Sequence, residues 1–121
     1  MKVVINRCHG GFGLSDEAFE LLLAKKNIEW EKVDTGKTFG FSRMVYYRKG
    51  HANEDEHYLS DYDFYDDRSD RDLIEVVETI GSAANGWAAE LKVVEIPDDV
   101  EWDVDEYDGL EWVAERHRTW C

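Results

Sequence analysis

The chain has 121 residues, which is enough for one domain with a modest hydrophobic core. Its 28 acidic side chains outnumber 14 basic ones, and the resulting net charge of −14 excludes general binding to nucleic acid or to an anionic membrane, since both require a basic surface. The charge fits either a partner with a basic surface, including one that normally holds nucleic acid, or simple solubility of a small charged domain.

The cysteine content and the lengths of the apolar runs indicate the cellular compartment in which the protein resides. Two cysteines, Cys8 and Cys121, cannot build a disulfide framework, so a reduced protein is expected. The apolar run at residues 2–5 is too short for a secretory signal, and no run has the length of a membrane span. We expect a cytoplasmic protein.

The first third of the chain predicts a strand, a glycine turn and a helix. Residues 2–6 form an apolar run typical of a buried strand, and residues 8–13 contain three glycines. Ser15 is a suitable N-cap for a helix over residues 16–26, with acidic side chains in its first turn. A glycine turn before a helix N-terminus is a place where an anion can bind.

The middle of the chain predicts strands and one long polar loop. Residues 28–33 alternate only in part, which favours an edge strand, and residues 34–37 have the composition of a turn. Residues 38–48 are rich in aromatic and β-branched side chains and predict a second strand. Residues 50–72 are the most polar part, for which we expect an ordered loop with a short strand near residues 57–59.

Acidic and tyrosine side chains alternate within residues 51–68, which we name the acidic segment and interpret as an insertion in the domain. Because aromatic side chains interleave with the acids, the composition differs from that of a disordered acidic tail. The predicted interaction surface consists of Glu54, Asp55, Glu56, Tyr58, Asp61, Tyr62, Asp63, Tyr65, Asp66 and Asp67.

A second helix and two strands follow. Ser69 is predicted to cap a helix that runs to Ala84, with a stop at Asn85-Gly86. Residues 91–96 predict a strand, and residues 100–105 alternate apolar with acidic side chains, which predicts a half-exposed strand with an acidic outer face.

Two interpretations compete after residue 105. Asp108-Gly109 suits a two-residue hairpin turn, whereas Asp108 as N-cap with Glu111 at the third helical position suits a short helix. A hairpin would place Glu106 opposite Glu111, so we favour the helix. The predicted fold is then a single compact α+β domain over residues 1–121, with a mixed sheet of four to five strands, two main helices and a short C-terminal helix.

Several stretches together resemble a family of small uncharacterised proteins encoded by bacteriophages and prophages. They begin with the opening MKVVINRC-x-GGFGLS and continue with residues 72–78, 84–86, 94–98, 106–109 and 117–120, whereas residues 28–68 lie outside the resemblance. The resemblance carries no activity and no catalytic residue. It implies a phage-borne protein that acts on host machinery inside the host cytoplasm.

The glycine turn does not match the specific phosphate-binding or hydrolase patterns. It departs from both G-x-G-x-x-G and G-x-x-x-x-G-K-[ST], and the chain has no G-x-S-x-G nucleophile elbow. A tight turn that needs glycine for its geometry accounts for it. The alternative is a site for a nucleotide or another small anion made of Arg7, His9, Gly10, Gly11, Ser15, His117 and Arg118.

No catalytic or metal pattern stands out. The sequence has no C-x-x-C and no H-x₃-H pair, and the closely spaced aspartates of the acidic segment lack the EF-hand spacing. We therefore expect no enzyme activity, no cofactor and no metal.

The function predicted first is that of an acidic binding protein that inhibits a host defence or nucleic-acid-processing protein. Such an inhibitor would act like an anti-CRISPR protein, by mimicking the charge of nucleic acid on a basic host surface. No direct contact with nucleic acid or membrane is expected, and a homodimer is a further option for assembly.

Overall fold

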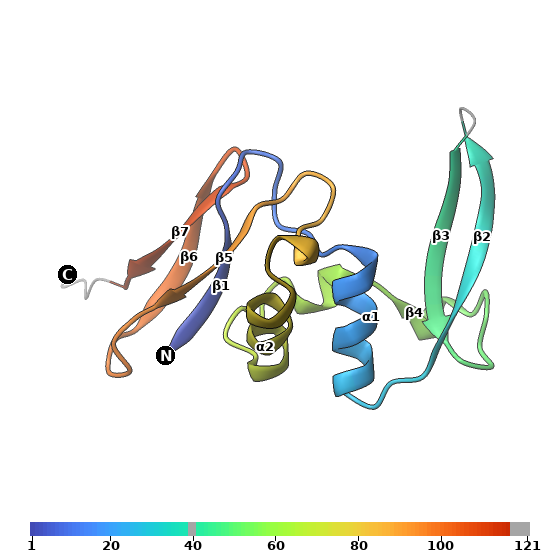
Figure 1. Ribbon diagram of the computed structural model, residues 1–121, viewed down its shortest axis with the longest axis horizontal. Helices are drawn as coiled ribbons and strands as arrows, with labels where there is room; N and C mark the ends of the chain where they lie inside the picture. The colour runs from blue at the N-terminus through green and yellow to red at the C-terminus, as the bar shows by residue number, and fades with distance from the viewer. Residues whose placement is uncertain (39–40, 117–121) are drawn as a thin grey trace, which may run out of the picture.

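The computed structural model describes residues 1–38 and 41–116, and two helices separate its strands into two groups (Figure 1). At one end a long hairpin projects from the body, and at the other end four strands lie together. The strands are β1 (Lys2–Asn6), β2 (Trp30–Thr38), β3 (Phe41–Arg48), β4 (Tyr58–Leu59), β5 (Leu91–Glu95), β6 (Trp102–Tyr107) and β7 (Leu110–Glu115). The helices are α1 (Asp16–Lys25), α2 (Arg71–Ile80) and the 3₁₀ turns η1 (Asp55–His57), η2 (Asp61–Phe64) and η3 (Gly81–Ala84).

The strands pair into three small antiparallel sheets, ordered β1-β5, β2-β3-β4 and β6-β7. The predicted α+β class is confirmed, and the predicted edge strand is β2. The prediction of one mixed sheet with four to five strands is wrong, because seven strands are present in separate antiparallel ladders. Among the described residues, neither helix is long and apolar enough to cross a membrane.

Both helices have side-chain caps. The Ser15 hydroxyl accepts a hydrogen bond from the Ala18 amide at 3.1 Å, as predicted. The cap of α2 is Asp70 and not the predicted Ser69, since the Asp70 carboxylate accepts from the Leu73 amide at 2.9 Å. The helix also ends earlier than predicted, at Gly81, whose φ of 58° suits glycine and turns the chain into η3.

One contiguous core joins the helices to strands of two sheets. Val4 of β1, Tyr46 of β3 and Leu59 of β4 all reach it, so the projecting hairpin is anchored at its base. Trp30 and Phe19 pack edge-on against Tyr46, with ring centroids 5.2 and 4.9 Å away. The buried members of the core are Val4, Leu14, Ala18, Phe19, Leu22, Leu23, Tyr46, Leu59, Leu73, Val76, Val77 and Ala84.

The turn predicted at residues 34–37 is wrong, because these residues continue β2. Asp34 pairs with Met44 and Lys37 pairs with Ser42, so three steps along β2 match two steps along β3. The extra residue is accommodated as a bulge, where residues that disfavour regular strands are tolerated.

The short C-terminal helix is also wrong, because β6 and β7 form a hairpin. Asp108 and Gly109 both have positive φ, at 50° and 87°, as a two-residue turn of this kind requires. Glu106 does lie opposite Glu111, but each carboxylate has its own partner. Glu106 accepts from the Gly109 amide at 2.9 Å, and Glu111 pairs with Arg68, which is distant in sequence.

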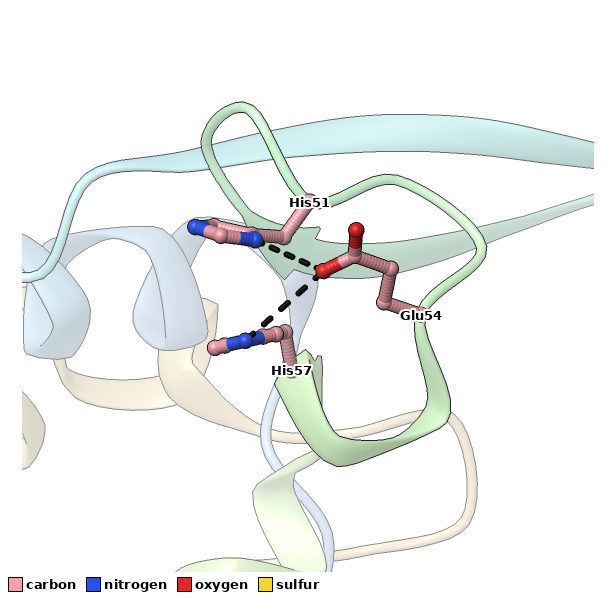
Figure 2. A group of neighbouring side chains, drawn as sticks. All are labelled: His51, Glu54 and His57. Atoms are coloured by element: carbon pink, nitrogen blue, oxygen red, sulfur yellow. Dashed lines mark hydrogen bonds and ion pairs between the residues drawn. The ribbon is translucent and has the colours of Figure 1, made fainter.

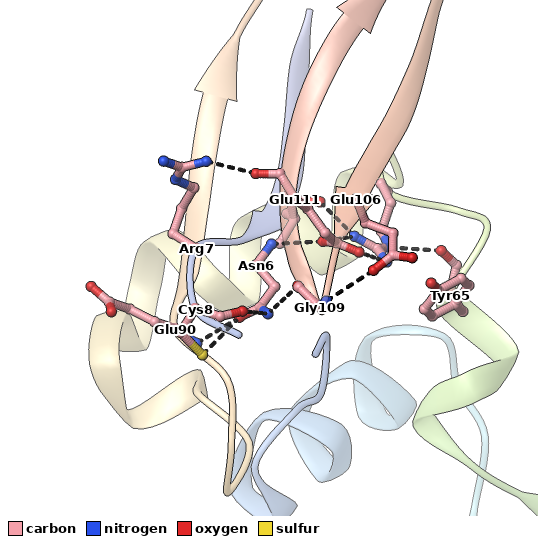
Figure 3. Close-up of polar contacts among 10 residues, drawn as sticks. Asn6, Arg7, Cys8, Tyr65, Glu90, Glu106, Gly109 and Glu111 are labelled. Atoms are coloured by element: carbon pink, nitrogen blue, oxygen red, sulfur yellow. Dashed lines mark hydrogen bonds and ion pairs between the residues drawn. The ribbon is translucent and has the colours of Figure 1, made fainter. Parts of the chain in front are cut away.

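The Arg68–Glu111 ion pair is buried, with 3% and 2% of the two residues exposed. Two hydrogen bonds of 2.6 and 2.8 Å join the guanidinium to the carboxylate in a bidentate arrangement. The same carboxylate accepts a hydrogen bond from the backbone amide of Asn6 at 2.7 Å, and the guanidinium donates to the Tyr65 carbonyl at 2.6 Å (Figure 3). The pair therefore fastens the end of the acidic segment to β1 and β7.

Removing one partner of this pair should be costly, because a buried charge is left without compensation. We expect Glu111→Leu to lower the free energy of unfolding by about 3–5 kcal/mol, and Arg68→Met added to it to recover part of the loss. Lys25→Gln breaks the exposed Lys25–Glu75 pair as a control and should cost about 1 kcal/mol or less. Urea unfolding measures all three, and equal losses for Glu111→Leu and Lys25→Gln would contradict the role given to the buried pair.

The ion pair between Lys26 and Asp70 makes the free energy of unfolding depend on pH. Burial alone would raise the pKa of Asp70, but hydrogen bonds from the Lys26 ammonium at 2.9 Å and from the Leu73 amide lower this pKa overall. A carboxylate with a lowered pKa stabilises the fold above its unfolded pKa of about 3.9, and this contribution is lost as the pH falls through the folded pKa.

The variant Asp70→Asn keeps a good N-cap and removes the charge, so its stability deficit should be largest near neutral pH and should shrink below about pH 4. Asp99→Asn, on an exposed turn, controls for the loss of one negative charge. Unfolding midpoints measured from pH 7 to pH 3 test this expectation. A stability deficit of Asp70→Asn that grows as the pH falls would contradict a lowered pKa for Asp70 in the folded protein.

Candidate functional site

The acidic segment is ordered, and some of its acids hold it in place. Asp61 accepts a hydrogen bond from the Leu14 amide at 3.0 Å, which joins η2 to the start of α1. Asp63 accepts from the Ser60 amide at 3.1 Å in a capping box at the start of η2. These two predicted surface residues therefore have structural roles.

Other members of the predicted surface are available to a partner. Four exposed carboxylates have no basic partner within the described residues, and these are Asp55, Glu56, Asp66 and Asp67. Tyr62 is 73% exposed and stacks on Tyr65, with ring centroids 5.2 Å apart. Tyr58 on β4 is also exposed, and its ring packs against Tyr47. Glu54 instead contacts two histidines.

The end of the acidic segment and β6 enclose a cleft of about 310 Å³, which we name the acidic cleft. Tyr65 and Asp66 line it from the segment, and Trp102 and Glu106 line it from β6. The remaining lining residues are Arg68, Asp103, Val104 and Glu111. Sequence analysis identified the segment and the acidic strand separately, and the fold brings them together.

The charges of the cleft leave it acidic. Glu111 neutralises Arg68, and Arg116 binds Asp103 at 2.7 Å. Hydrogen bonding to Arg116 lowers the pKa of Asp103 and keeps that carboxyl ionised. Asp66 has no basic partner in the described chain, and Glu106 accepts only from the Gly109 amide. Two carboxylates and the Trp102 ring in one lining suit a guanidinium or an ammonium group. The Tyr65 ring already contacts Tyr62 and the Arg68 guanidinium.

The glycine turn, by contrast, is packed against backbone on two sides. A Cβ on Gly10 would lie 1.8 Å from the Ala88 carbonyl oxygen, so no larger residue fits there. A Cβ on Gly109 of the β6–β7 hairpin would lie 2.6 Å from the His9 carbonyl oxygen and 2.7 Å from the Gly11 nitrogen. Close approach of three backbone segments therefore explains glycine at these positions.

Asn6 fastens the same three segments with its buried side chain (Figure 3). Its amide nitrogen donates to the carbonyls of Cys8 at 2.6 Å and Gly109 at 2.8 Å, and its amide oxygen accepts from the Glu90 amide at 2.8 Å. The turn is thus a structural junction between β1, the loop before β5 and the hairpin.

The groups that would hold an anion at the turn already have partners. The Ser15 hydroxyl donates to the Ala83 carbonyl at 2.6 Å, and the Arg7 guanidinium donates to the Glu111 carbonyl at 2.7 Å. His9 Nδ1 lies 3.3 Å from the Asp108 carbonyl oxygen. His117 and Arg118 lie outside the described residues. Since Asp61 also places a carboxylate at the Leu14 amide, this geometry does not favour the predicted nucleotide site, which stays a prediction.

Sequence analysis missed one group of residues. His51, Glu54 and His57 converge in the turn between β3 and β4, and one donor atom from each lies within 4.8 Å of the others. The signal in the sequence is a histidine, a glutamate and a histidine at intervals of three residues. This spacing is neither a C-x-x-C nor an H-x₃-H pair nor an EF-hand loop, so none of those patterns indicates it.

Comparison of the chain with protein-family models, with characterised proteins and with solved structures finds no match. The predicted resemblance to phage and prophage proteins therefore stays a prediction. What the chain can do has to be argued from its own geometry.

Steric contact at the glycine turn can be tested with a matched pair of substitutions. Gly109 and Gly50 have almost the same φ, 87° and 84°, but only Gly109 has backbone atoms where a Cβ would lie. Gly50→Ala should therefore cost roughly the 1–2 kcal/mol of an unfavourable φ, and Gly109→Ala should cost clearly more in urea unfolding. Equal losses in the free energy of unfolding would mean that the hairpin and the glycine turn are not in close contact at Gly109.

Proposed function

We propose that this protein is a non-enzymatic binding protein that docks on a basic protein surface through its acidic cleft and the adjoining acidic segment. The observation that carries the proposal is the cleft itself, whose lining includes the carboxylates of Asp66 and Glu106 and the aromatic residues Tyr65 and Trp102. An arginine or lysine side chain of the partner would fill the cleft, and the free carboxylates of the segment would meet further basic groups.

The net charge supports this mode of binding. A charge of −14 draws a basic partner over a distance and raises the association rate, more strongly at low ionic strength. Affinity then depends on groups that are desolvated in the contact, and aromatic rings beside a cation supply such a contact.

The biological form that we propose is inhibition of a host defence or nucleic-acid-processing protein. A protein that holds nucleic acid presents a basic surface, and an acidic domain of this charge can compete for it. The resemblance to phage proteins adds the context of a host cell. We further propose that the protein acts in the cytoplasm of the host cell, where such partners occur.

A soluble oligo-arginine peptide is a direct probe of the cleft. We expect isothermal titration calorimetry to show binding that weakens as salt rises. The double variant Asp66→Asn/Glu106→Gln should bind about tenfold more weakly, since two charge pairs of about 0.5–1 kcal/mol each are lost. Glu106→Gln retains the oxygen that accepts from the Gly109 amide, so the hairpin turn should persist.

The control is Glu95→Gln/Asp99→Asn, which removes the same charge from exposed positions outside the cleft. It should leave the affinity nearly unchanged. Equal weakening by the two double variants would reduce the interaction to net charge, and an absence of binding at low salt would contradict the proposal altogether.

Trp102→Ala tests the aromatic contribution apart from charge. A cation over a tryptophan ring contributes about 0.5–2 kcal/mol, so this variant should weaken peptide binding without changing its salt dependence. Trp87→Ala is the matched control, because Trp87 is fully exposed and does not line the cleft. If both variants bind like the wild type, the ring of Trp102 does not contact the cation.

A further inference from the structure

His51, Glu54 and His57 place three metal-binding side chains together in the turn that joins β3 to β4 (Figure 2). The Oε2 atom of Glu54 lies 2.6 Å from Nδ1 of His51 and 3.7 Å from Nε2 of His57. The two imidazole rings stack at 3.9 Å between centroids and are inclined by 25°. Both histidines therefore present a nitrogen to the same carboxylate oxygen.

The backbone produces this convergence through successive three-residue turns. The His51 amide donates to the Arg48 carbonyl, the Glu54 amide to the His51 carbonyl and the His57 amide to the Glu54 carbonyl, at 3.0, 3.1 and 2.9 Å. In such i→i+3 turns, side chains three positions apart lie on the same side. A left-handed residue, Asn53 with φ 65°, redirects the chain between the first two ligands.

The two ends of this turn are fixed by the sheet. Tyr46 and Tyr47 of β3 pair with Leu59 and Tyr58 of β4, and both Tyr46 and Leu59 are buried in the core. Because the flanking residues are held in this way, the three side chains come together before any ion binds. Such a preformed site costs less ordering when a ligand binds.

The donor set selects a class of ion. Two imidazole nitrogens and one carboxylate oxygen suit first-row transition metals such as Zn²⁺, Co²⁺ and Ni²⁺, whereas Mg²⁺ and Ca²⁺ prefer oxygen ligands throughout. Ligand atoms around a four-coordinate zinc ion stand about 3.3–3.5 Å apart for bonds of about 2.0–2.2 Å. The ligand atoms, all within 4.8 Å of one another, are close enough for one ion. To bind it, Glu54 Oε2 must separate from His51 Nδ1, and the two stacked rings must turn so that both nitrogens face the ion.

The site is open to ions from solvent. The side chains of His51, Glu54 and His57 are 45%, 51% and 30% exposed. Asp55 and Glu56 add negative charge within the same turn, and Arg48 and Lys49 just before it add positive charge. Three protein ligands leave at least one coordination position for water or for a group of a partner.

We propose that His51, Glu54 and His57 bind one divalent first-row transition-metal ion of the zinc class. The ion would take the place now filled by the hydrogen bond between Glu54 and His51. Bound there, it would join the start of the turn to η1 and would add a positive charge beside the acidic segment. This site is separate from the acidic cleft, and it does not depend on the function proposed for the cleft.

Titration of the protein with Zn²⁺, followed by isothermal titration calorimetry and by the histidine signals in NMR spectra, tests the proposal. We expect one ion per chain, with the signals of His51 and His57 shifting and that of His9 unchanged. His51→Gln and His57→Gln should each weaken binding by about tenfold or more, and Glu54→Gln should weaken it through loss of the charged ligand. Co²⁺ should bind at the same site with a visible absorption band, and excess Mg²⁺ should not compete.

The control variants are His9→Gln and Cys8→Ser, which remove other metal-binding side chains and should leave the affinity unchanged. Circular dichroism of each variant checks that the fold persists, which is expected because none of the three side chains belongs to the buried core. Absence of stoichiometric Zn²⁺ binding to the folded wild type would overturn the proposal, and so would retention of the site in His51→Gln/His57→Gln. The three residues would then form a hydrogen-bonded cluster only.

Discussion

The bidentate contact between Arg68 and Glu111 is the interaction on which the arrangement of this protein depends. It lies where the acidic segment ends, where β1 begins its turn and where β7 leaves the hairpin. The guanidinium carbon also lies 3.8 Å from the centroid of the Phe12 ring and 4.7 Å from that of the Tyr65 ring. A buried charge with so many partners has few alternative positions, so it fixes how three distant parts of the chain meet.

The acidic cleft follows from that contact. Because Glu111 neutralises the guanidinium of Arg68, the segment can approach β6 without presenting a positive charge to the cleft. Asp66 and Glu106 then line the same cleft, together with Tyr65 and Trp102. An exposed acidic loop alone would give only long-range attraction, whereas the cleft that we propose as the binding site would give one cationic side chain a defined place.

Local patterns predicted the parts of the fold that depend on neighbours in sequence. The Ser15 cap, the helix that follows it and the short strand at β4 were confirmed, because each is determined within a few residues. The hairpin at Asp108-Gly109 was predicted as a helix, because hairpin pairing places Glu106 opposite Glu111. The repulsion expected between these two carboxylates is relieved by Arg68, which neutralises Glu111. No local pattern indicates a partner 43 positions away. The acidic cleft was missed for the same reason, whereas the histidine cluster was present in the sequence as a three-residue spacing.

The central claim is that cationic partners are received in the acidic cleft and are not held by the overall negative charge. Titration of isotopically labelled protein with an oligo-arginine peptide, followed by NMR at each backbone amide and at the Trp102 indole, tests it most directly. The account predicts that the largest shifts fall on Tyr65, Asp66, Trp102 and Glu106 and saturate together. Shifts of similar size spread over acidic positions that do not line the cleft, such as Glu78, Glu95 and Asp99, would contradict it.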